Sequence, residues 1–317
     1  MESIDIIPKI DLNIASERKI WNEYFPNGLI HIPNKCDKCS KNISIKENNT
    51  IINPYIGRCC NPQCRKIYYL REGSLFNLFS KTSISLIKYV ILLNLDYQKN
   101  DKQIHDLLKN NNAELPISQQ NISHILDIMR YIIAHYMKDC YYLEKIAELN
   151  GHASISIDES LFVHQGQKQI WVAGLINNNS RKIRLEILPN RSTDTMKKII
   201  TNFVPTGNTI VTDGASFYNW LDNPRYGYKH SVHSHGHGDF GAGVDSTSHI
   251  EQLWHYIIPS EKFILFLREA EFRRNMKNFT NNSLLKEFET VCIYVNTVVG
   301  NEFYDLDFLN KLTIDSL

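Results

Sequence analysis

The order of apolar segments after Asn150-Gly151 most narrows the folds open to this chain. Alternating and β-branched residues predict three strands in succession, then a helix, a strand, a second helix, a short strand and a last helix. The predicted elements cover residues 153–158, 170–176, 183–188, 193–203, 209–213, 216–221 and 229–232, with the last helix around 248–254. This order predicts an α/β domain whose single sheet begins with three hairpin-type strands.

Three acidic residues occupy these segments. Asp158 ends the first strand, Asp213 ends the fourth, and Glu251 lies on the last helix. Three carboxylates at one sheet edge can hold two divalent metal ions about 4 Å apart, an arrangement that drives in-line phosphoryl transfer. Glu159 and Asp245 lie nearby in sequence and are the acids most easily mistaken for members of this set. Any single acid after a strand is commonly a cap or turn residue. Element order and acids together predict a ribonuclease H-like domain with a polynucleotidyl transferase site.

Five of the seven cysteines lie between Cys36 and Cys64. Because the amino terminus does not resemble a secretory signal, this clustering favours a metal site over disulfides. The pair Cys36-x2-Cys39, followed by a second pair that ends at Cys64, has the spacing of a zinc ribbon, in which four thiolates surround a structural Zn2+. The partner of Cys64 stays open, because Cys59 and Cys60 are adjacent: we expect Cys59, with Cys60 as the alternative.

The segment after the cysteines predicts helices. Apolar residues recur at helical spacing over 83–95 and 101–109, and Ser118 is placed to cap a third helix that continues to about Leu149. Two short helices joined by a polar turn indicate a helix-turn-helix-like region, although many such pairs merely pack together. Residues 35–109 hold 13 Lys/Arg against 6 Asp/Glu in a chain of net charge +1, and this local excess fits either a DNA-binding face or a solvated surface.

The histidines before the last helix permit two interpretations. His230, His233, His235 and His237 could indicate a second zinc site. Their glycine-rich setting favours a loop that contacts DNA or the active site instead.

These patterns divide the chain into five segments. The longest apolar stretch, 84–95, is interrupted by Ser85, Lys88 and Asn94 and is too short to span a bilayer. We therefore expect no membrane association, and a location in the nucleus of a eukaryotic host or otherwise in the cytoplasm. The expected segments are a leader (1–30), a zinc ribbon (31–80), a helical DNA-binding region (81–150), a catalytic domain (151–278) and a C-terminal tail (279–317).

Several motifs in a fixed order resemble one known family. They are Ile157-Asp158-Glu159-Ser160, Trp171-Val172-Ala173-Gly174-Leu175, Leu188-Pro189-Asn190-Arg191-Ser192, Ile210-Val211-Thr212-Asp213-Gly214, Ile250-Glu251-Gln252-Leu253-Trp254 and Leu267-Arg268-Glu269-Ala270-Glu271-Phe272-Arg273-Arg274-Asn275, preceded by the cysteine segment and Arg71-Glu72-Gly73-Ser74-Leu75-Phe76. Over residues 31–278 the chain resembles the Merlin family of cut-and-paste DNA transposases, which are related to bacterial insertion-sequence transposases with an ISXO-like catalytic domain.

The resemblance implies a function and its residues. Asp158, Asp213 and Glu251 would be the DDE triad, which uses Mg2+ or Mn2+ for cleavage and strand transfer. The amino-terminal modules would bind the terminal inverted repeats of double-stranded DNA, and the enzyme would act on target DNA as a homo-oligomer. The alternatives are a domesticated sequence-specific DNA-binding protein and a ribonuclease H-like nuclease without strand transfer.

Overall fold

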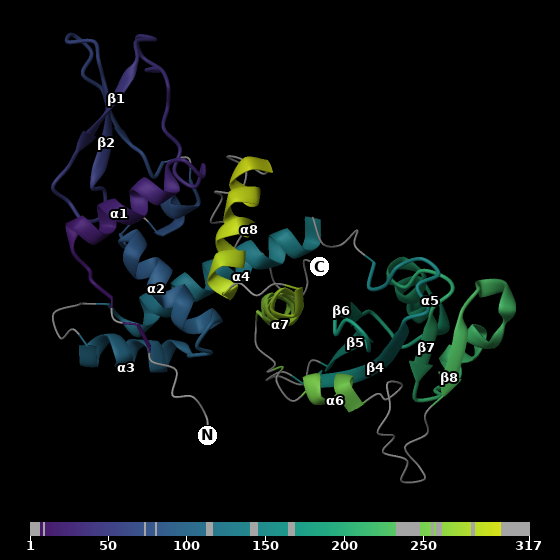
Figure 1. The fold of residues 1–317 in the computed structure, drawn as a ribbon. Helices are drawn as coiled ribbons and strands as arrows, with labels where there is room; N and C mark the ends of the chain where they lie inside the picture. The colour runs from purple at the N-terminus through teal and green to yellow at the C-terminus, as the bar shows by residue number, and fades with distance from the viewer. Residues whose placement is uncertain are drawn as a thin grey trace. The chain divides into compact units, whose positions relative to one another are not determined.

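The computed structural model describes residues 7–8, 10–72, 74–79, 81–111, 117–139, 145–163, 169–232, 248–254, 257, 262–279 and 283–298 (Figure 1). The chain divides into two compact units. The first gathers the described residues of Met1–Ile132 and Asn282–Lys311, and the second those of Ile133–Asn281. No helix in these ranges is long and apolar enough to cross a membrane.

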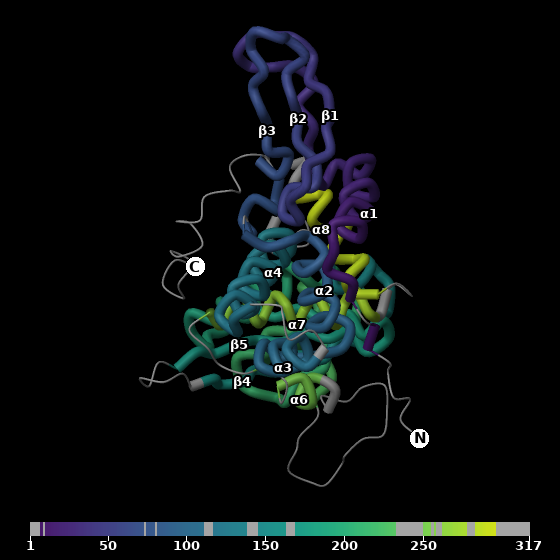
Figure 2. Tube along the Cα trace, turned by 90° about the vertical axis from the view of Figure 1, so that its left-hand side faces the viewer, coloured from purple at the N-terminus to yellow at the C-terminus, as the bar shows by residue number. Residues whose placement is uncertain are grey.

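A small antiparallel sheet forms the cysteine-bearing part of the first unit. Its strands β1 (Ile43–Glu47), β2 (Tyr55–Cys59) and β3 (Ile67–Tyr69) lie side by side in that order (Figure 2). Helix α1 (Ile14–Tyr24) packs beside this sheet, where the fully buried Trp21 ring lies 6.2 Å from the Tyr55 ring, centroid to centroid. The leader expected at 1–30 therefore contains a helix that belongs to the core of this unit.

The rest of the first unit is helical. It contains the short 3-10 helix η1 (Leu75–Phe79), α2 (Ile84–Leu95), α3 (Asp101–Asn111), the first part of α4 (Gln119–Asp139), and α8 (Leu284–Val298). The buried carboxylate of Glu17 accepts hydrogen bonds from the backbone N–H groups of Ile84 and Ser85, at 2.7 and 2.8 Å. It thereby satisfies two of the donors that the first turn of α2 leaves without helical partners.

Helix α8 differs from the sequence prediction, which gives residues 279–317 as a C-terminal tail. Asp96, at the end of α2, accepts from the backbone N–H of Leu284 at 2.6 Å and so caps α8. Glu289 of α8 pairs with Lys88 of α2 at 2.8 Å and accepts from the Tyr24 hydroxyl at 2.6 Å. These contacts make α8 part of the first unit, although 188 residues separate Leu284 from Asp96 in sequence.

The prediction that the third helix continues to Leu149 is wrong. Helix α4 ends at Asp139, and the described residues from Lys145 onward follow an irregular path. The backbone N–H of Ile146 donates to Phe203 O at 2.9 Å, and that of Asn150 donates to Thr206 O at 3.1 Å. This segment therefore uses its backbone donors on the connection between α5 and β7 instead of on a helix of its own.

The second unit is built on a five-stranded sheet in the order β6-β5-β4-β7-β8. Strands β4, β5 and β6 pair antiparallel, whereas β4, β7 and β8 pair parallel. The bounds are β4 (Ser154–Val163), β5 (Gln169–Asn177), β6 (Ile183–Leu188), β7 (Thr209–Thr212) and β8 (Lys229–Val232). Three antiparallel strands followed by parallel crossovers are the ribonuclease H-like arrangement, so this prediction is confirmed.

Helices cover both faces of this sheet. One apolar cluster joins Ile155, Ile157 and Ile210 to α5 (Thr193–Phe203) and the 3-10 helix η2 (Ser216–Asp222). A separate cluster joins Phe162 and Val172 to α6 (Ser248–Trp254) and α7 (Phe263–Phe279). Because strand side chains alternate between faces, odd-numbered positions of β4 point toward α5 and even-numbered positions toward α6.

Two boundaries differ from those expected. Strand β4 continues five residues past Asp158, where Leu161 and Phe162 remain paired with β5, so Asp158 lies inside the strand and not at its end. The segment expected as a helix at 216–221 is the 3-10 helix η2. The acid and serine after Asp158 resemble a turn in sequence, but hairpin pairing overrides that local preference.

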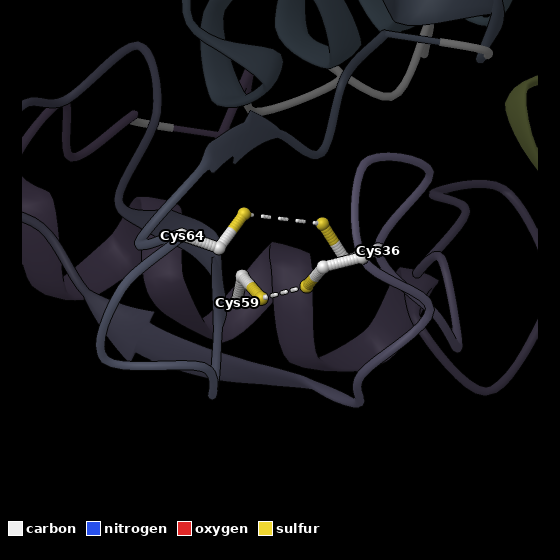
Figure 3. Close-up of side chains that lie close together, drawn as sticks. Cys36, Cys59 and Cys64 are labelled. Carbon is white, nitrogen blue, oxygen red and sulfur yellow. Dashed lines mark hydrogen bonds between the residues drawn. The ribbon is translucent and has the colours of Figure 1, made fainter.

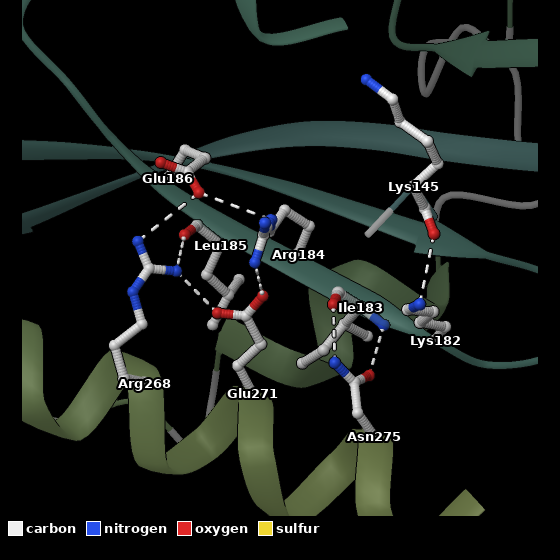
Figure 4. Close-up of polar contacts among 9 residues, drawn as sticks. All are labelled: Lys145, Lys182, Ile183, Arg184, Leu185, Glu186, Arg268, Glu271 and Asn275. Atoms are coloured by element: carbon white, nitrogen blue, oxygen red, sulfur yellow. Dashed lines mark hydrogen bonds and ion pairs between the residues drawn. The ribbon is translucent and has the colours of Figure 1, made fainter. Parts of the chain in front are cut away.

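Helix α7 protects the free edge of the sheet at β6. The side chain of the fully buried Asn275 accepts from Ile183 N at 2.7 Å and donates to Ile183 O at 3.0 Å (Figure 4). Arg268 donates to Leu185 O at 2.8 Å, and the buried Glu271 receives both Arg268 and Arg184, at 2.6 and 3.1 Å. The motif 267–275 thus satisfies backbone groups that an edge strand would otherwise leave unpaired.

Replacing Asn275 with leucine tests this account of the motif. The change keeps a similar volume but leaves a buried N–H and a buried C=O of Ile183 without partners, which costs about 1–3 kcal/mol for each group. We expect the free energy of unfolding to fall by about 2–4 kcal/mol in denaturant titrations. Arg274→Leu, at the exposed neighbouring position, should change it by less than about 0.5 kcal/mol. Equal effects of the two variants would contradict the edge-pairing role.

Candidate active site and metal centre

Asp158 lies in the middle of β4, on the face of the sheet that α6 covers. Its Oδ2 accepts a hydrogen bond from the indole Nε1 of Trp254 at 2.8 Å. Asp158 pairs across the sheet with Gly174 of β5. The indole therefore fixes the orientation of this carboxylate.

Asp213 follows β7 directly, and the strand register brings it level with Asp158. Ser156 pairs with Val211 in the parallel ladder. Asp158 lies two residues past Ser156 inside β4, and Asp213 lies two residues past Val211, directly after the end of β7. The Asp213 Oδ1 atom accepts from the backbone N–H of Ala215 at 2.9 Å, which holds the carboxylate at the start of the turn.

A buried histidine supports the turn that carries Asp213. His230 of β8 contacts Thr212 Oγ1 through Nε2 at 2.9 Å and Asp222 Oδ1 through Nδ1 at 2.8 Å. Thr212 Oγ1 also accepts from the backbone N–H of Gly214 at 3.3 Å. Gly214 has φ +84°, and a side chain there would collide with Val232 at 2.6 Å, so this turn requires glycine. These contacts fix the backbone on both sides of Asp213.

Glu251 is placed by the close approach of α6 to the sheet. A Cβ atom on Gly174 would lie 2.6 Å from Ile250 Cδ1 and 2.6 Å from Trp254 Cη2. The missing side chain at Gly174 thus makes room for the two α6 residues that flank Glu251. Ile250 is fully buried, whereas Glu251 is only half-buried.

The charges of the other two acids act on Asp158. Burial raises the pKa of the Asp158 carboxyl above its ordinary value, and the negative charges of Asp213 and Glu251 raise it further, against the lowering effect of the Trp254 hydrogen bond. In the described part of the chain no lysine or arginine pairs with Asp158 or Asp213. A site with this excess of negative charge favours a bound cation, since a divalent ion reverses the repulsion among its carboxylates.

Glu159 belongs to a different environment. It lies on the opposite face of β4, where Arg191 pairs with Oε2 at 3.2 Å and the Tyr218 hydroxyl donates to Oε1. The Arg191 guanidinium also lies over the Trp171 ring, 4.2 Å from its centroid. The negative charge of Glu159 is therefore already paired with the positive charge of Arg191. Asp245, the other alternative, lies outside the described residues.

Adding a side chain at Gly174 should misplace α6. In Gly174→Ala the new methyl group forces Ile250 and Trp254 away from the sheet, and Glu251 moves with them. A misplacement of about 1 Å can cost about 100-fold in rate, so we expect metal-dependent DNA cleavage to fall about 10- to 100-fold and Gly174→Val to be worse. Cleavage assays with thermal unfolding as a control measure this, and a fully active Gly174→Val would refute it.

Four of the clustered cysteines form a second candidate site, in the first unit. The Sγ atoms of Cys36, Cys39, Cys59 and Cys64 all lie within 4.8 Å of one another. Cys36 Sγ lies 3.7 Å from Cys64 Sγ, and Cys39 Sγ lies 3.3 Å from Cys59 Sγ (Figure 3). A tetrahedral Zn2+ with Zn–S bonds of about 2.3 Å separates its thiolates by about 3.8 Å, so the cluster fits this ion.

The geometry distinguishes the two adjacent cysteines. Cys59 ends β2, is buried, and joins the other three thiols, whereas the side chain of Cys60 is exposed. The backbone N–H of Asn61 points at Cys59 Sγ at 3.4 Å, as in a metal-binding knuckle. Among the described residues, this is the one set of three or more cysteine, histidine or acidic groups whose ligand atoms are all so close. The carboxylate oxygens of the three acids in the second unit do not come this close together as a set.

A polar second layer surrounds the thiols. The Tyr68 hydroxyl lies 3.0 Å from Cys36 Sγ and 2.6 Å from Asp37 Oδ1, and Lys66 pairs with Asp37 at 2.7 Å. The hydrogen bond from Tyr68 lowers the pKa of the Cys36 thiol to about 6. Burial raises the pKa of the Cys59 thiol to about 12. Such contacts orient ligands and favour the thiolate at Cys36.

Sequence reasoning missed several supporting residues. Of the histidine run, only His230 lies in the described residues, where it supports the Asp213 turn; His233, His235 and His237 lie outside them. Trp254 and Gly174 belong to two of the family motifs, but the sequence alone assigned them no part in the site. Their signal was an aromatic donor one helical turn after Glu251 and a glycine inside a strand, which often marks close approach.

Comparison with known proteins gives a family for the second unit. Residues 152–275 match the model of the ISXO2-like transposase domain. The chain contains an ISXO2-like transposase domain. All three acids lie inside the matched residues, as do β4 to β8 and most of α7. The narrower resemblance to the Merlin family stays a prediction.

Solved structures similar to part of this chain include retroviral integrases. The HTLV-2 integrase catalytic core domain in complex with magnesium, in its trimeric form, is 11% identical, covers 49% of this chain and 88% of its own, and has a TM-score of 0.25. The simian T-cell lymphotropic virus intasome in complex with PP2A regulatory subunit B56 gamma is 11% identical, covers 57% and 66%, and has a TM-score of 0.27. A search of curated proteins found no match.

Proposed function

We propose that this protein is a DDE transposase in which Asp158, Asp213 and Glu251 hold two Mg2+ or Mn2+ ions. The observation that supports it best is the parallel pairing of β4 with β7, which brings Asp213 level with Asp158, whose pKa is raised by burial and by the charges of Asp213 and Glu251. Neither aspartate is paired with a lysine or arginine in the described part of the chain, unlike Glu159. The transposase domain match spans all three positions.

The chemistry follows from this arrangement. When bound, the ions supply activation of water or of a DNA 3′-hydroxyl and stabilisation of the leaving 3′ oxygen. The chain's own residues act as ligands and supports, and not as the main proton acceptors. Trp254 orients Asp158, the His230 contacts hold the Asp213 turn, and Gly174 lets α6 bring Glu251 to the sheet.

The first unit would select the DNA. We propose that its zinc ribbon, stabilised by one Zn2+ on Cys36, Cys39, Cys59 and Cys64, and its helices bind the terminal inverted repeats. The basic excess over residues 35–109 supports phosphate contacts. The transposition complex would be a homo-oligomer that also engages target DNA, in the nucleus of a eukaryotic host or otherwise in the cytoplasm.

A cleavage assay tests this proposal. Full-length protein is incubated with a duplex that carries the inverted repeat flanking its coding region, with Mg2+, Mn2+ or EDTA. We expect specific nicking at the repeat end with either metal and none with EDTA. A domesticated DNA-binding protein would bind the repeat without cutting it. A nuclease without targeting would cut this duplex and a random duplex equally.

A further inference from the structure

The register of the small β sheet sorts its side chains onto two faces. Lys46, Ile56 and Tyr69 are aligned in one cross-strand row, and Ser44, Arg58 and Ile67 in the next. Directly opposed residues share a face, as do residues two apart on one strand. These six residues therefore form one surface, which we call the ribbon face.

The opposite face of this sheet carries its contacts with α1 and with the thiol cluster, although Ile45 on that face is 39% exposed. Tyr55 packs its ring against Phe25 of the turn after α1, at 5.6 Å between centroids. Glu47 pairs with Arg18 of α1 at 2.9 Å, and Cys59 joins the thiol cluster. Gly57 on that face is crowded, since a Cβ atom there would meet Ile43 at 2.9 Å. The sheet is thus anchored through one face only.

The ribbon face is open and positively charged. Ile67 is 43% exposed and Tyr69 is 51% exposed, which is unusual for such side chains on a sheet with so small a core. Lys46 and Arg58 are exposed as well, and neither forms an ion pair with any residue that the structure describes. The face has no acidic residue, so its formal charge is +2.

We propose that the ribbon face is a docking surface for duplex DNA, with Lys46 and Arg58 on phosphates and Ile67 and Tyr69 against the groove edge. The inference rests on the proposed function and deepens it. Lys46 lies on β1 and Arg58 on the adjacent β2 (Figure 2), so both cations belong to a two-stranded ribbon, an element that a major groove about 12 Å across admits. Two cations without an acid on the same face are complementary to phosphates, and a face of six residues is too small for a stable protein interface.

Salt-dependent binding tests this surface. Full-length protein and its variants are titrated with the inverted-repeat duplex at several salt concentrations. Each lost phosphate contact should lower the slope of log affinity against log salt by about 0.9, so Lys46→Ala with Arg58→Ala should lower it by about 1.8. Tyr69→Ala should weaken binding about tenfold with the slope unchanged, because it loses contact area and no charge.

The matched control is Lys19→Ala. Lys19 is exposed on α1, which packs on the other face of the sheet, so its loss should leave both affinity and slope nearly unchanged. All variants should retain the zinc content of the wild type, which shows that the ribbon is folded.

The outcomes separate the two proposals. If the wild type binds the repeat and the Lys46 and Arg58 variants behave like Lys19→Ala, the ribbon face is not the DNA-docking surface, and the proposed transposase function is unaffected. If the wild type binds no duplex at all, DNA targeting by the first unit fails, and the ribbon face with it.

Discussion

Replacing any one of Asp158, Asp213 or Glu251 with its amide is expected to abolish strand cleavage. Asn or Gln keeps the shape and some hydrogen bonding of the carboxylate but removes the charge that holds a divalent ion. We expect the cleavage rate to fall by on the order of 1000-fold, which corresponds to about 4 kcal/mol of transition-state stabilisation. Gel assays of repeat-end cleavage measure this, with repeat binding as the control, which should stay nearly intact.

Glu159→Gln and Asp245→Asn are the matched controls, because each also replaces a carboxylate with its amide. Glu159 is held by Arg191 and Tyr218 on the opposite face of β4, so its amide should reduce stability more than cleavage. Asp245 matches no catalytic position of the family that the chain resembles. If Glu251→Gln cleaved normally while Asp245→Asn did not, Glu251 would be the wrong third acid.

Loss of one zinc ligand should have the second large effect. Cys59→Ser removes a buried thiol from the four-sulfur cluster, and structural zinc contributes about 10–16 kcal/mol of apparent binding free energy in small zinc modules. We expect bound zinc to fall from one per chain to well below that, the ribbon to lose its fold, and repeat binding to be lost. Elemental analysis and circular dichroism measure the first two effects.

Cys60→Ser is the control for this prediction. Cys60 is adjacent in sequence but exposed, so its replacement should leave zinc content and DNA binding unchanged. Protein purified without chelators that contains no zinc would overturn the structural-zinc assignment. A zinc loss in Cys60→Ser but not in Cys59→Ser would reverse the choice of ligand.

Local patterns predicted most of the catalytic unit because its strands are short, apolar and separated by clear turns. The strand and helix order from residue 153 to 232 could be predicted with boundaries mostly within a few residues. The exceptions have a common cause. β4 passes Asp158 because β5 pairs with it, and α8 is ordered by Asp96 and Lys88, far away in sequence. Tertiary contacts of this kind leave no periodic signal.

The sites divide in the same way. Spacing alone indicated two cysteine pairs. The choice of Cys59 over Cys60 as a ligand needs the structure, in which Cys59 is buried in the thiol cluster and Cys60 is exposed. The choice of Asp158 and Asp213 rested on predicted strand ends and family resemblance, although β4 continues past Asp158, and the residues that support them were not predicted. Trp254 and His230 act through side chains that meet across 96 and 18 residues of sequence, contacts that a one-dimensional pattern does not contain.

A strand-transfer assay tests the central claim most directly. A pre-cleaved repeat-end duplex with a free 3′-hydroxyl is incubated with full-length protein, a supercoiled target plasmid and Mg2+ or Mn2+. The account predicts covalent joining of the repeat end to the plasmid, dependent on the metal and absent in Asp158→Asn, Asp213→Asn and Glu251→Gln. Metal-dependent nicking of the plasmid without any joined product would contradict it.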